Sequence, residues 1–149
     1  MAGERPIKGL GEIALRVENL EAMEKFYRDI VGLGPMEGGR FPHAVFFRIA
    51  EGVGGHTQIL ALFDRRATKG YRGLSRELTT VDHIALEVCL EDFAAEKARL
   101  EKLGVQLETA EHLWVRWRSL YFHDPEGNEI EFVCRDATVR ADTQRKRGN

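Results

Sequence analysis

The sequence predicts an α+β protein built from two βαβββ modules, and three observations lead to this prediction. An I-A-L-x-V core occurs twice, at residues 13–17 and 84–88. Each copy alternates apolar and polar residues and is followed by helical spacing that a glycine ends. The 149 residues suffice for two small modules that share a core.

The first module spans residues 8–64 and begins with a strand at 12–17. Asn19 is placed to cap a helix over 20–31, and Gly32 is placed to end it. Three strand-like stretches follow: a short one near Met36, then H-A-V-F-F-R-I-A and T-Q-I-L-A-L-F-D. The predicted order is therefore βαβββ.

The second module spans residues 80–134 and repeats that order. A strand over 83–88 precedes a helix that Gly104 ends, and the short stretch V-Q-L-E is the expected next strand. W-R-S-L-Y-F-H and E-I-E-F-V-C complete the module, joined by the turn sequence D-P-E-G-N. A basic connector at 65–79 joins the modules, and residues 135–149 are expected to be a charged tail.

Composition narrows the class of function. The formal net charge of −2 gives no electrostatic case for binding nucleic acid. No apolar run reaches membrane-spanning length, and the N-terminus lacks the apolar region of a secretory signal. Cys89 and Cys134 have neither disulfide-framework density nor metal-knuckle spacing, so we expect reduced thiols in a cytoplasmic protein.

Strand alternation places three metal-capable side chains on comparable faces. Helices cover one face of each sheet, so Ile13, Leu15 and Val17 should turn toward a helix. Glu12 in the first module and His83 in the second then lie on the other face. Glu131 shares the face of His83, and we expect these two side chains to converge from the first and last strands of one module.

These motifs together resemble the vicinal oxygen chelate superfamily, also called the glyoxalase/bleomycin resistance/extradiol dioxygenase superfamily. The resemblance rests on D-H-I-A-L-E-V, L-E-A-M-E-K-F-Y-R-D-I-V-G-L-G and Y-F-H-D-P-E-G-N-E-I-E-F, and covers about residues 8 to 134. It implies paired modules whose sheets form a cupped, incomplete β-barrel. It also implies metal ligands from the first and last strands of each module.

Carried over by position, the resemblance implies a metal site formed by His83, Glu131 and Glu12. Glu12 stands where many relatives have histidine, and it is also the expected catalytic base. The fourth ligand position falls on Ala61, which cannot bind metal. Gln58 lies on the opposite strand face by parity, and His56 lies in a glycine-rich loop, so whether either replaces the missing ligand stays open. The ion would be Zn, Ni, Mn, Fe or Co.

Five further residues are candidates for substrate binding. If Leu120 and Phe122 face the helix, Ser119 and Tyr121 should lie on the other face of the sheet, where a substrate cleft is expected. Phe46 and Arg48 occupy the equivalent strand face in the first module. Trp117 is a candidate for the cavity mouth. An aromatic ring and a cation in such a cavity suit a planar or anionic ligand. Packing between the sheets is the alternative for Phe46 and Tyr121.

Two functions remain open from the sequence. The first is a glyoxalase-like, metal-dependent enzyme that chelates a small oxygen-rich or aromatic substrate, as a lyase or isomerase, or as a dioxygenase if the metal is iron. The second is a metal-free protein that binds or sequesters a small molecule, of the bleomycin-resistance type. The missing ligand at Ala61 favours it, whereas the presence of both His83 and Glu131 argues against it. We also expect a homodimer, whose modules pair within one chain or exchange between chains.

Overall fold

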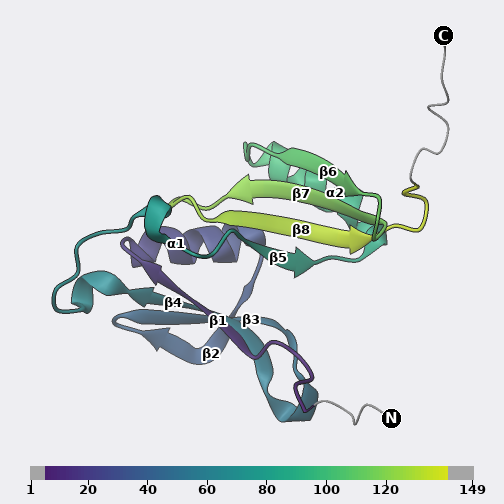
Figure 1. Ribbon diagram of the computed structural model, residues 1–149. Helices are drawn as coiled ribbons and strands as arrows, with labels where there is room; N and C mark the ends of the chain where they lie inside the picture. Colours follow the sequence, from purple (N-terminus) through teal and green to yellow (C-terminus); the bar gives the residue numbers. More distant parts are fainter. Residues whose placement is uncertain (1–5, 141–149) are drawn as a thin grey trace. The chain divides into compact units, whose positions relative to one another are not determined.

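The computed structural model describes residues 6–140 and shows two compact units, Met1–Glu77 and Leu78–Asn149. Each unit contains one four-stranded mixed sheet (Figure 1). The α+β fold with two βαβββ modules is therefore confirmed. Within the described residues, no helix combines the length and apolar character needed to cross a membrane.

The first unit follows the order β1, α1, β2, β3, β4. Its elements are β1 (Glu12–Val17), α1 (Leu20–Lys25), a π-helical segment (Phe26–Val31), β2 (Gly34–Phe41), β3 (Ala44–Glu51) and β4 (Thr57–Asp64). The strands lie in the order β1-β4-β3-β2, and β1 runs parallel to β4 while the other pairs are antiparallel. The first and last strands of the unit are thus neighbours.

The sequence around α1 explains where this helix begins and where its π-helical continuation ends. The Asn19 side chain accepts a hydrogen bond from the backbone N–H of Ala22 at 3.0 Å, as an N-cap does. Gly32 adopts a left-handed conformation with φ of 87°, which a residue without Cβ reaches at low cost. Met23 and Tyr27 are buried, and the Tyr27 ring lies 6.4 Å from that of Phe47 in β3. The helix therefore covers one face of the sheet.

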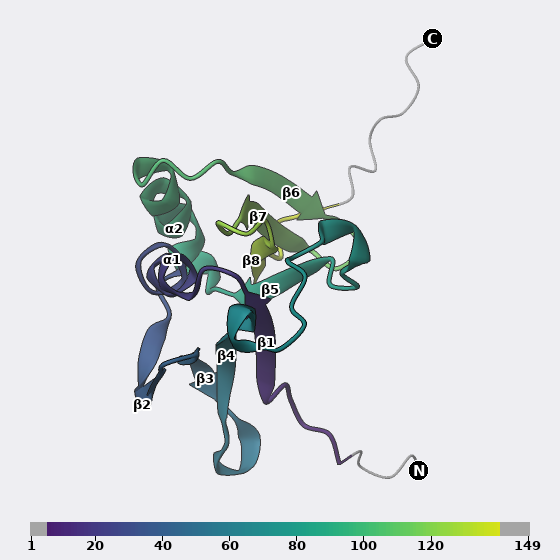
Figure 2. The same cartoon turned by 90° about the vertical axis from the view of Figure 1, so that its left-hand side faces the viewer.

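The second unit repeats this plan. It contains β5 (His83–Glu87), α2 (Leu90–Lys102), β6 (Glu108–His112), β7 (Trp117–His123) and β8 (Glu129–Arg135). The strand order is β5-β8-β7-β6, with β5 parallel to β8. Helix α2 runs along one face of this sheet, as the turned view also shows (Figure 2). Phe93 and Leu100 of the helix are buried, as are Leu120, Phe122 and Ile130 of the sheet.

The position of the sixth strand is a correction. V-Q-L-E was expected to form it, but the strand is Glu108–His112, with sequence E-T-A-E-H. Val105 instead completes the end of α2: its N–H bonds to the carbonyl of Leu100, and the N–H of Gly104 bonds to that of Glu101. This pair of bonds is the Schellman motif, which uses the residues just after a helix.

Short connections complete the chain. Single 3₁₀ turns occur at Val53–Gly55, Arg65–Ala67 and Arg76–Leu78. Asp124 holds the turn between β7 and β8, since its carboxylate accepts from the N–H groups of Glu126 and Asn128 at 2.9 Å each. Residues 135–140, assigned by the sequence to a charged tail, include the end of β8 and the buried Val139, and residues 141–149 lie outside the described part.

Candidate functional site

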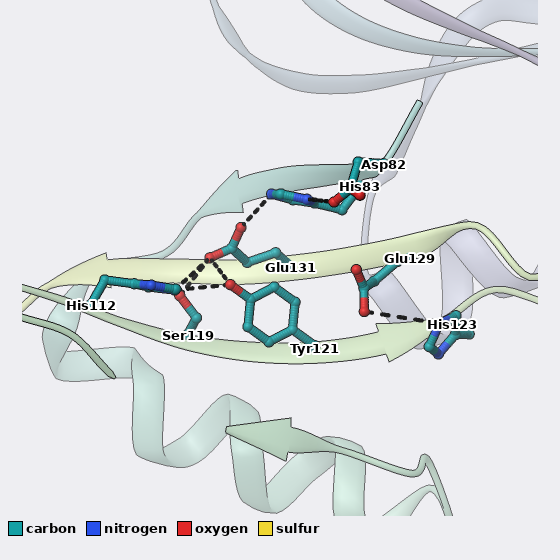
Figure 3. A network of polar contacts seen from close by, with 8 residues as sticks. All are labelled: Asp82, His83, His112, Ser119, Tyr121, His123, Glu129 and Glu131. Carbon is teal, nitrogen blue, oxygen red and sulfur yellow. Dashed lines mark hydrogen bonds and ion pairs between the residues drawn. The ribbon is translucent and has the colours of Figure 1, made fainter. Parts of the chain in front are cut away.

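The face of the second sheet opposite α2 carries a dense group of polar side chains. The strand register sets them in rows that cross β5, β8 and β7. One row is His83, Glu129 and His123, and the next is Ala85, Glu131 and Tyr121. Figure 3 shows the polar side chains of both rows on one face, together with Asp82, His112 and Ser119.

His83 and Glu131 meet at the centre of this group, as the alternation of residues predicts. The Nε2 atom of His83 lies 3.1 Å from Oε2 of Glu131 (Figure 3). Glu131 is only 5% exposed, whereas the His83 side chain is 37% exposed. The pair therefore combines a buried carboxylate with an imidazole that solvent reaches.

Asp82 holds the other nitrogen of the His83 ring. Its Oδ1 atom lies 2.7 Å from Nδ1 of His83, so the ring stands between two carboxylates. The hydrogen bond to Asp82 is the main cause that raises the pKa of His83 above its ordinary value, and the charge of Glu131 adds to it. Partial burial works in the opposite direction. A carboxylate on Nδ1 also orients the ring so that Nε2 faces Glu131.

The second oxygen of Glu131 is held by two hydroxyl groups. Oε1 accepts hydrogen bonds from Ser119 Oγ at 2.5 Å and from Tyr121 OH at 3.0 Å. Ser119 has no exposed surface. Burial, which is the main cause, and the nearby Glu131 charge raise the pKa of Tyr121. The phenol therefore keeps its proton at neutral pH and remains a donor to Glu131.

His112 extends this chain of hydrogen bonds. Its Nε2 atom lies 2.9 Å from the hydroxyl of Tyr121 and 3.9 Å from Oε1 of Glu131. Since the Tyr121 proton points to Glu131, the consistent tautomer has His112 donating from Nε2 to the Tyr121 oxygen. Sequence reasoning missed His112, because E-T-A-E-H on the edge strand β6 lacks apolar alternation.

The first sheet offers a different set of groups at the equivalent positions. Glu12 faces Ile59 across the β1–β4 pair, as His83 faces Glu129 in the second sheet. Ala14 faces Ala61, as Ala85 faces Glu131. The register therefore agrees with the sequence alignment that sets Ala61 against Glu131, and Glu12 is exposed.

The two alternative side chains near the missing ligand lie apart from Ala61. Gln58 opposes Ala50 and has the parity of the buried Leu60, so it is not on the face of Ala61. His56 lies before β4, and its ring is close to Gly11, where an added Cβ would stand 3.6 Å from Cε1. His56 is thus near the start of β1 rather than beside Ala61.

Three of the expected substrate contacts have other neighbours within their own units: Phe46 and Arg48 belong to the first unit, and Trp117 begins β7 in the second. Phe46 packs edge-to-face against Phe41 and Phe63, and it lines a cavity of about 250 Å³ in the first unit. Arg48 forms an ion pair with Glu51. Trp117 is 42% exposed and its ring lies 6.4 Å from that of Trp114. Ser119 and Tyr121, by contrast, contact Glu131 directly.

Comparisons with known proteins agree with this architecture. The model of the glyoxalase/bleomycin resistance protein/dioxygenase superfamily matches residues 9–132. An iron-dependent extradiol dioxygenase from Rhodococcus jostii (strain RHA1) is 25% identical over 135 residues, which cover 89% of this chain and 45% of that protein. The chain thus spans about half the length of this curated relative.

Two solved structures illustrate the likeness in fold. A lactoylglutathione lyase from Agrobacterium tumefaciens is 28% identical with a TM-score of 0.61, covering 87% of this chain and 96% of that chain. A variant of the fosfomycin resistance protein FosX from Listeria monocytogenes, complexed with Mn(II) and 1S,2S-dihydroxypropylphosphonic acid, is 23% identical with a TM-score of 0.61. That comparison covers 90% of this chain and 95% of the FosX chain, and it supports the fold alone.

Proposed function

Because the chain belongs to the glyoxalase/bleomycin resistance protein/dioxygenase superfamily, we propose that it is a metal-dependent enzyme acting on a small oxygen-rich or aromatic molecule. The reaction class we assign is proton-transfer chemistry of the lyase or isomerase kind, or dioxygenation if the metal is iron. One observation carries the proposal: His83 Nε2 and Glu131 Oε2 converge at 3.1 Å on the open face of the second sheet.

The residues present fit a divalent ion. Imidazole nitrogen and carboxylate oxygen are common ligands of first-row ions, which they bind at about 2.0–2.2 Å, so two ligands of one ion stand roughly 3 Å apart. The His83–Glu131 separation has this magnitude. Asp82 on Nδ1 supplies the outer hydrogen bond that metal-binding histidines usually make. The name of the iron-dependent extradiol dioxygenase from Rhodococcus jostii, which resembles this chain, is consistent with such a site.

The surrounding side chains keep Glu131 in place. Ser119 and Tyr121 both donate to Oε1, which leaves Oε2 directed at His83. We assign these two hydroxyls to positioning Glu131, rather than to the direct substrate contact that strand parity alone suggested. His112 supports the Tyr121 hydroxyl from the far side. A divalent ion held here would act as a Lewis acid toward two adjacent substrate oxygens.

Glu12 is the proposed third ligand and the proton-accepting group. Its strand position in the first module equals that of His83 in the second. A carboxylate is chemically suited to both tasks, since it binds divalent ions and accepts protons from carbon or oxygen acids. Phe46, Arg48 and Trp117 remain proposed substrate contacts, for an aromatic or anionic portion of the molecule.

One observation favours a second candidate function, a metal-free protein that binds or sequesters a small molecule. Ala61 occupies the position where the second sheet has Glu131, so one carboxylate of a symmetric ligand set is absent. A cavity of about 250 Å³ lined by Met36, Phe41 and Phe46 could then hold an apolar group without metal chemistry.

Metal analysis separates the two functions. We expect purified protein to carry one tightly bound first-row divalent ion per chain, and His83→Ala to lose it while keeping the circular dichroism of the wild type. His43→Ala, which changes an exposed histidine between β2 and β3, is the matched control and should retain the ion. Wild-type protein that binds no such ion after exposure to Zn²⁺, Ni²⁺, Mn²⁺, Fe²⁺ and Co²⁺ would favour the metal-free binding protein.

A further inference from the structure

A second group of metal-capable side chains lies one row from Glu131. His83, Glu129 and His123 are aligned across β5, β8 and β7, and Asp82 directly precedes β5. One ligand atom each from Asp82, His83 and Glu129 lies within 4.8 Å of the others. His123 Nε2 lies 4.0 Å from Oε1 of Glu129 (Figure 3).

Glu129 is the centre of this outer group. Its side chain is 32% exposed and has the His83–Asp82 pair on one side and His123 on the other. The Asp82 and His123 side chains are 91% and 60% exposed, so they can rotate toward a common point at little packing cost. Ligands of one ion stand roughly 3 Å apart, and His123 Nε2 is already 4.0 Å from Glu129 Oε1.

The charges of the outer group match a dication. Asp82 and Glu129 contribute two negative charges, and a neutral imidazole of His123 adds a nitrogen donor without charge. His83 is committed to the inner pair, because its Nε2 faces Glu131. Three donors from three different segments therefore remain for a separate ion.

The first unit shows that this donor set is particular to the second sheet. The row equivalent to His83, Glu129 and His123 consists there of Glu12, Ile59 and Arg48. An isoleucine and an arginine cannot complete a cation site. The same row of the fold therefore does not carry metal-binding side chains in both units, and their grouping is a feature of the second unit.

We propose that Asp82, Glu129 and His123 bind a second divalent ion of the first transition row, beside the inner site of His83 and Glu131. The exposed ligands make this outer site the weaker of the two, because more side-chain freedom is lost when the ion binds. Its occupancy draws Asp82 away from Nδ1 of His83. Since binding coupling is reciprocal, the outer ion should also lower the affinity of the inner one.

Calorimetric titration of the metal-stripped full chain with Zn²⁺, and separately with Mn²⁺, tests this proposal. We expect two ions per chain, the second weaker than the first. Glu129→Gln and His123→Asn should each weaken the second event by about ten-fold or more. Glu87→Gln is the matched control, because Glu87 is an exposed carboxylate on the same face of β5, two residues beyond the row of Ala85.

Glu131→Gln separates this proposal from the proposed function. It should weaken the tighter binding event, assigned to the inner ion, and keep the weaker one, assigned to the outer ion. A single ion at saturation in the wild type overturns the outer site. So does a second event that neither Glu129→Gln nor His123→Asn changes, since that ion binds elsewhere. If Glu131→Gln leaves both binding events unchanged, the inner assignment fails while the outer site stands.

Discussion

His83 Nε2 and Glu131 Oε2 lie 3.1 Å apart, although the two residues belong to the first and last strands of the second unit. The parallel pairing of β5 with β8 brings them together, in a register that sets His83 opposite Glu129 and Ala85 opposite Glu131. Because the two strands are adjacent, the imidazole reaches one row along the neighbouring strand. The variants below separate the groups that bind from those that position.

Glu12→Gln tests whether the first module supplies a ligand. A neutral amide is a poorer ligand than a carboxylate, so we expect a loss of metal affinity, by about ten-fold or more, without a change in fold. Glu12→His should preserve binding and shift the preference toward softer ions. Metal titration of both variants beside Glu77→Gln, an exposed carboxylate outside the sheets, gives the answer. Equal affinity in wild type and Glu12→Gln would confine the site to the second module.

The pKa of His83 in metal-free protein should lie above its ordinary value of 6.5, chiefly because Asp82 bonds to Nδ1. A pKa raised by folding adds stability that is present below about pH 6.5 and is lost as pH rises through the folded pKa. NMR titration of the His83 ring should show that Asp82→Asn lowers its pKa more than Glu131→Gln does. An unchanged pKa in Asp82→Asn contradicts this account. Metal affinity should fall as the ring protonates, because the ion and the proton compete for Nε2.

Ser119→Ala and Tyr121→Phe should each weaken metal binding while leaving His83 and Glu131 in the chain. Each change removes one donor to Oε1 of Glu131, and loss of such outer hydrogen bonds typically costs about 10–100-fold in affinity. The loss should appear in titration as weaker binding at unchanged stoichiometry. Ser75→Ala, in an exposed part of the connector, is the control and should bind as the wild type does. If Ser119→Ala and Tyr121→Phe bind metal normally, Glu131 needs neither hydroxyl for its orientation.

We expect the chain to form a homodimer with a two-fold axis. In the described residues each sheet is open, with β1 and β2 at the edges of one and β5 and β6 at the edges of the other. Edge strands expose unpaired backbone groups, and pairing between chains removes those groups from solvent. Light scattering after size exclusion at micromolar concentration measures the mass directly. A monomer under these conditions rejects the expectation.

Strand alternation allowed much of the fold and the inner pair to be predicted. Ile13, Leu15 and Val17 lie on the helix-facing side of their strand, and Leu15 and Val17 are buried. The same parity places His83 and Glu131 on one open face. Period-two patterns carry this information because one face of each strand packs against a helix and the other does not.

The surroundings of Glu131 were harder to predict, for identifiable physical reasons. His112 lies on β6, an edge strand whose polar sequence carries no alternation, so the apolar Val105 and Leu107 drew the strand prediction to the wrong place. Ser119 had the correct parity, but parity does not distinguish a side chain facing substrate from one bonded to a neighbouring carboxylate. Those distinctions depend on register across strands, which one sequence does not specify.

The parallel contact of β5 with β8 also has a consequence for folding kinetics. Of the strand pairings in the second unit, this one joins the segments most distant in sequence, so forming it closes a long loop. An ion held by His83 and Glu131 binds only after that closure, and it should slow unfolding rather than speed folding. At an ion concentration 100 times the Kd, the added stability is about 2.7 kcal/mol. The lifetime of the folded second unit should then follow the supply of metal, which unfolding rates measured with and without the ion would reveal.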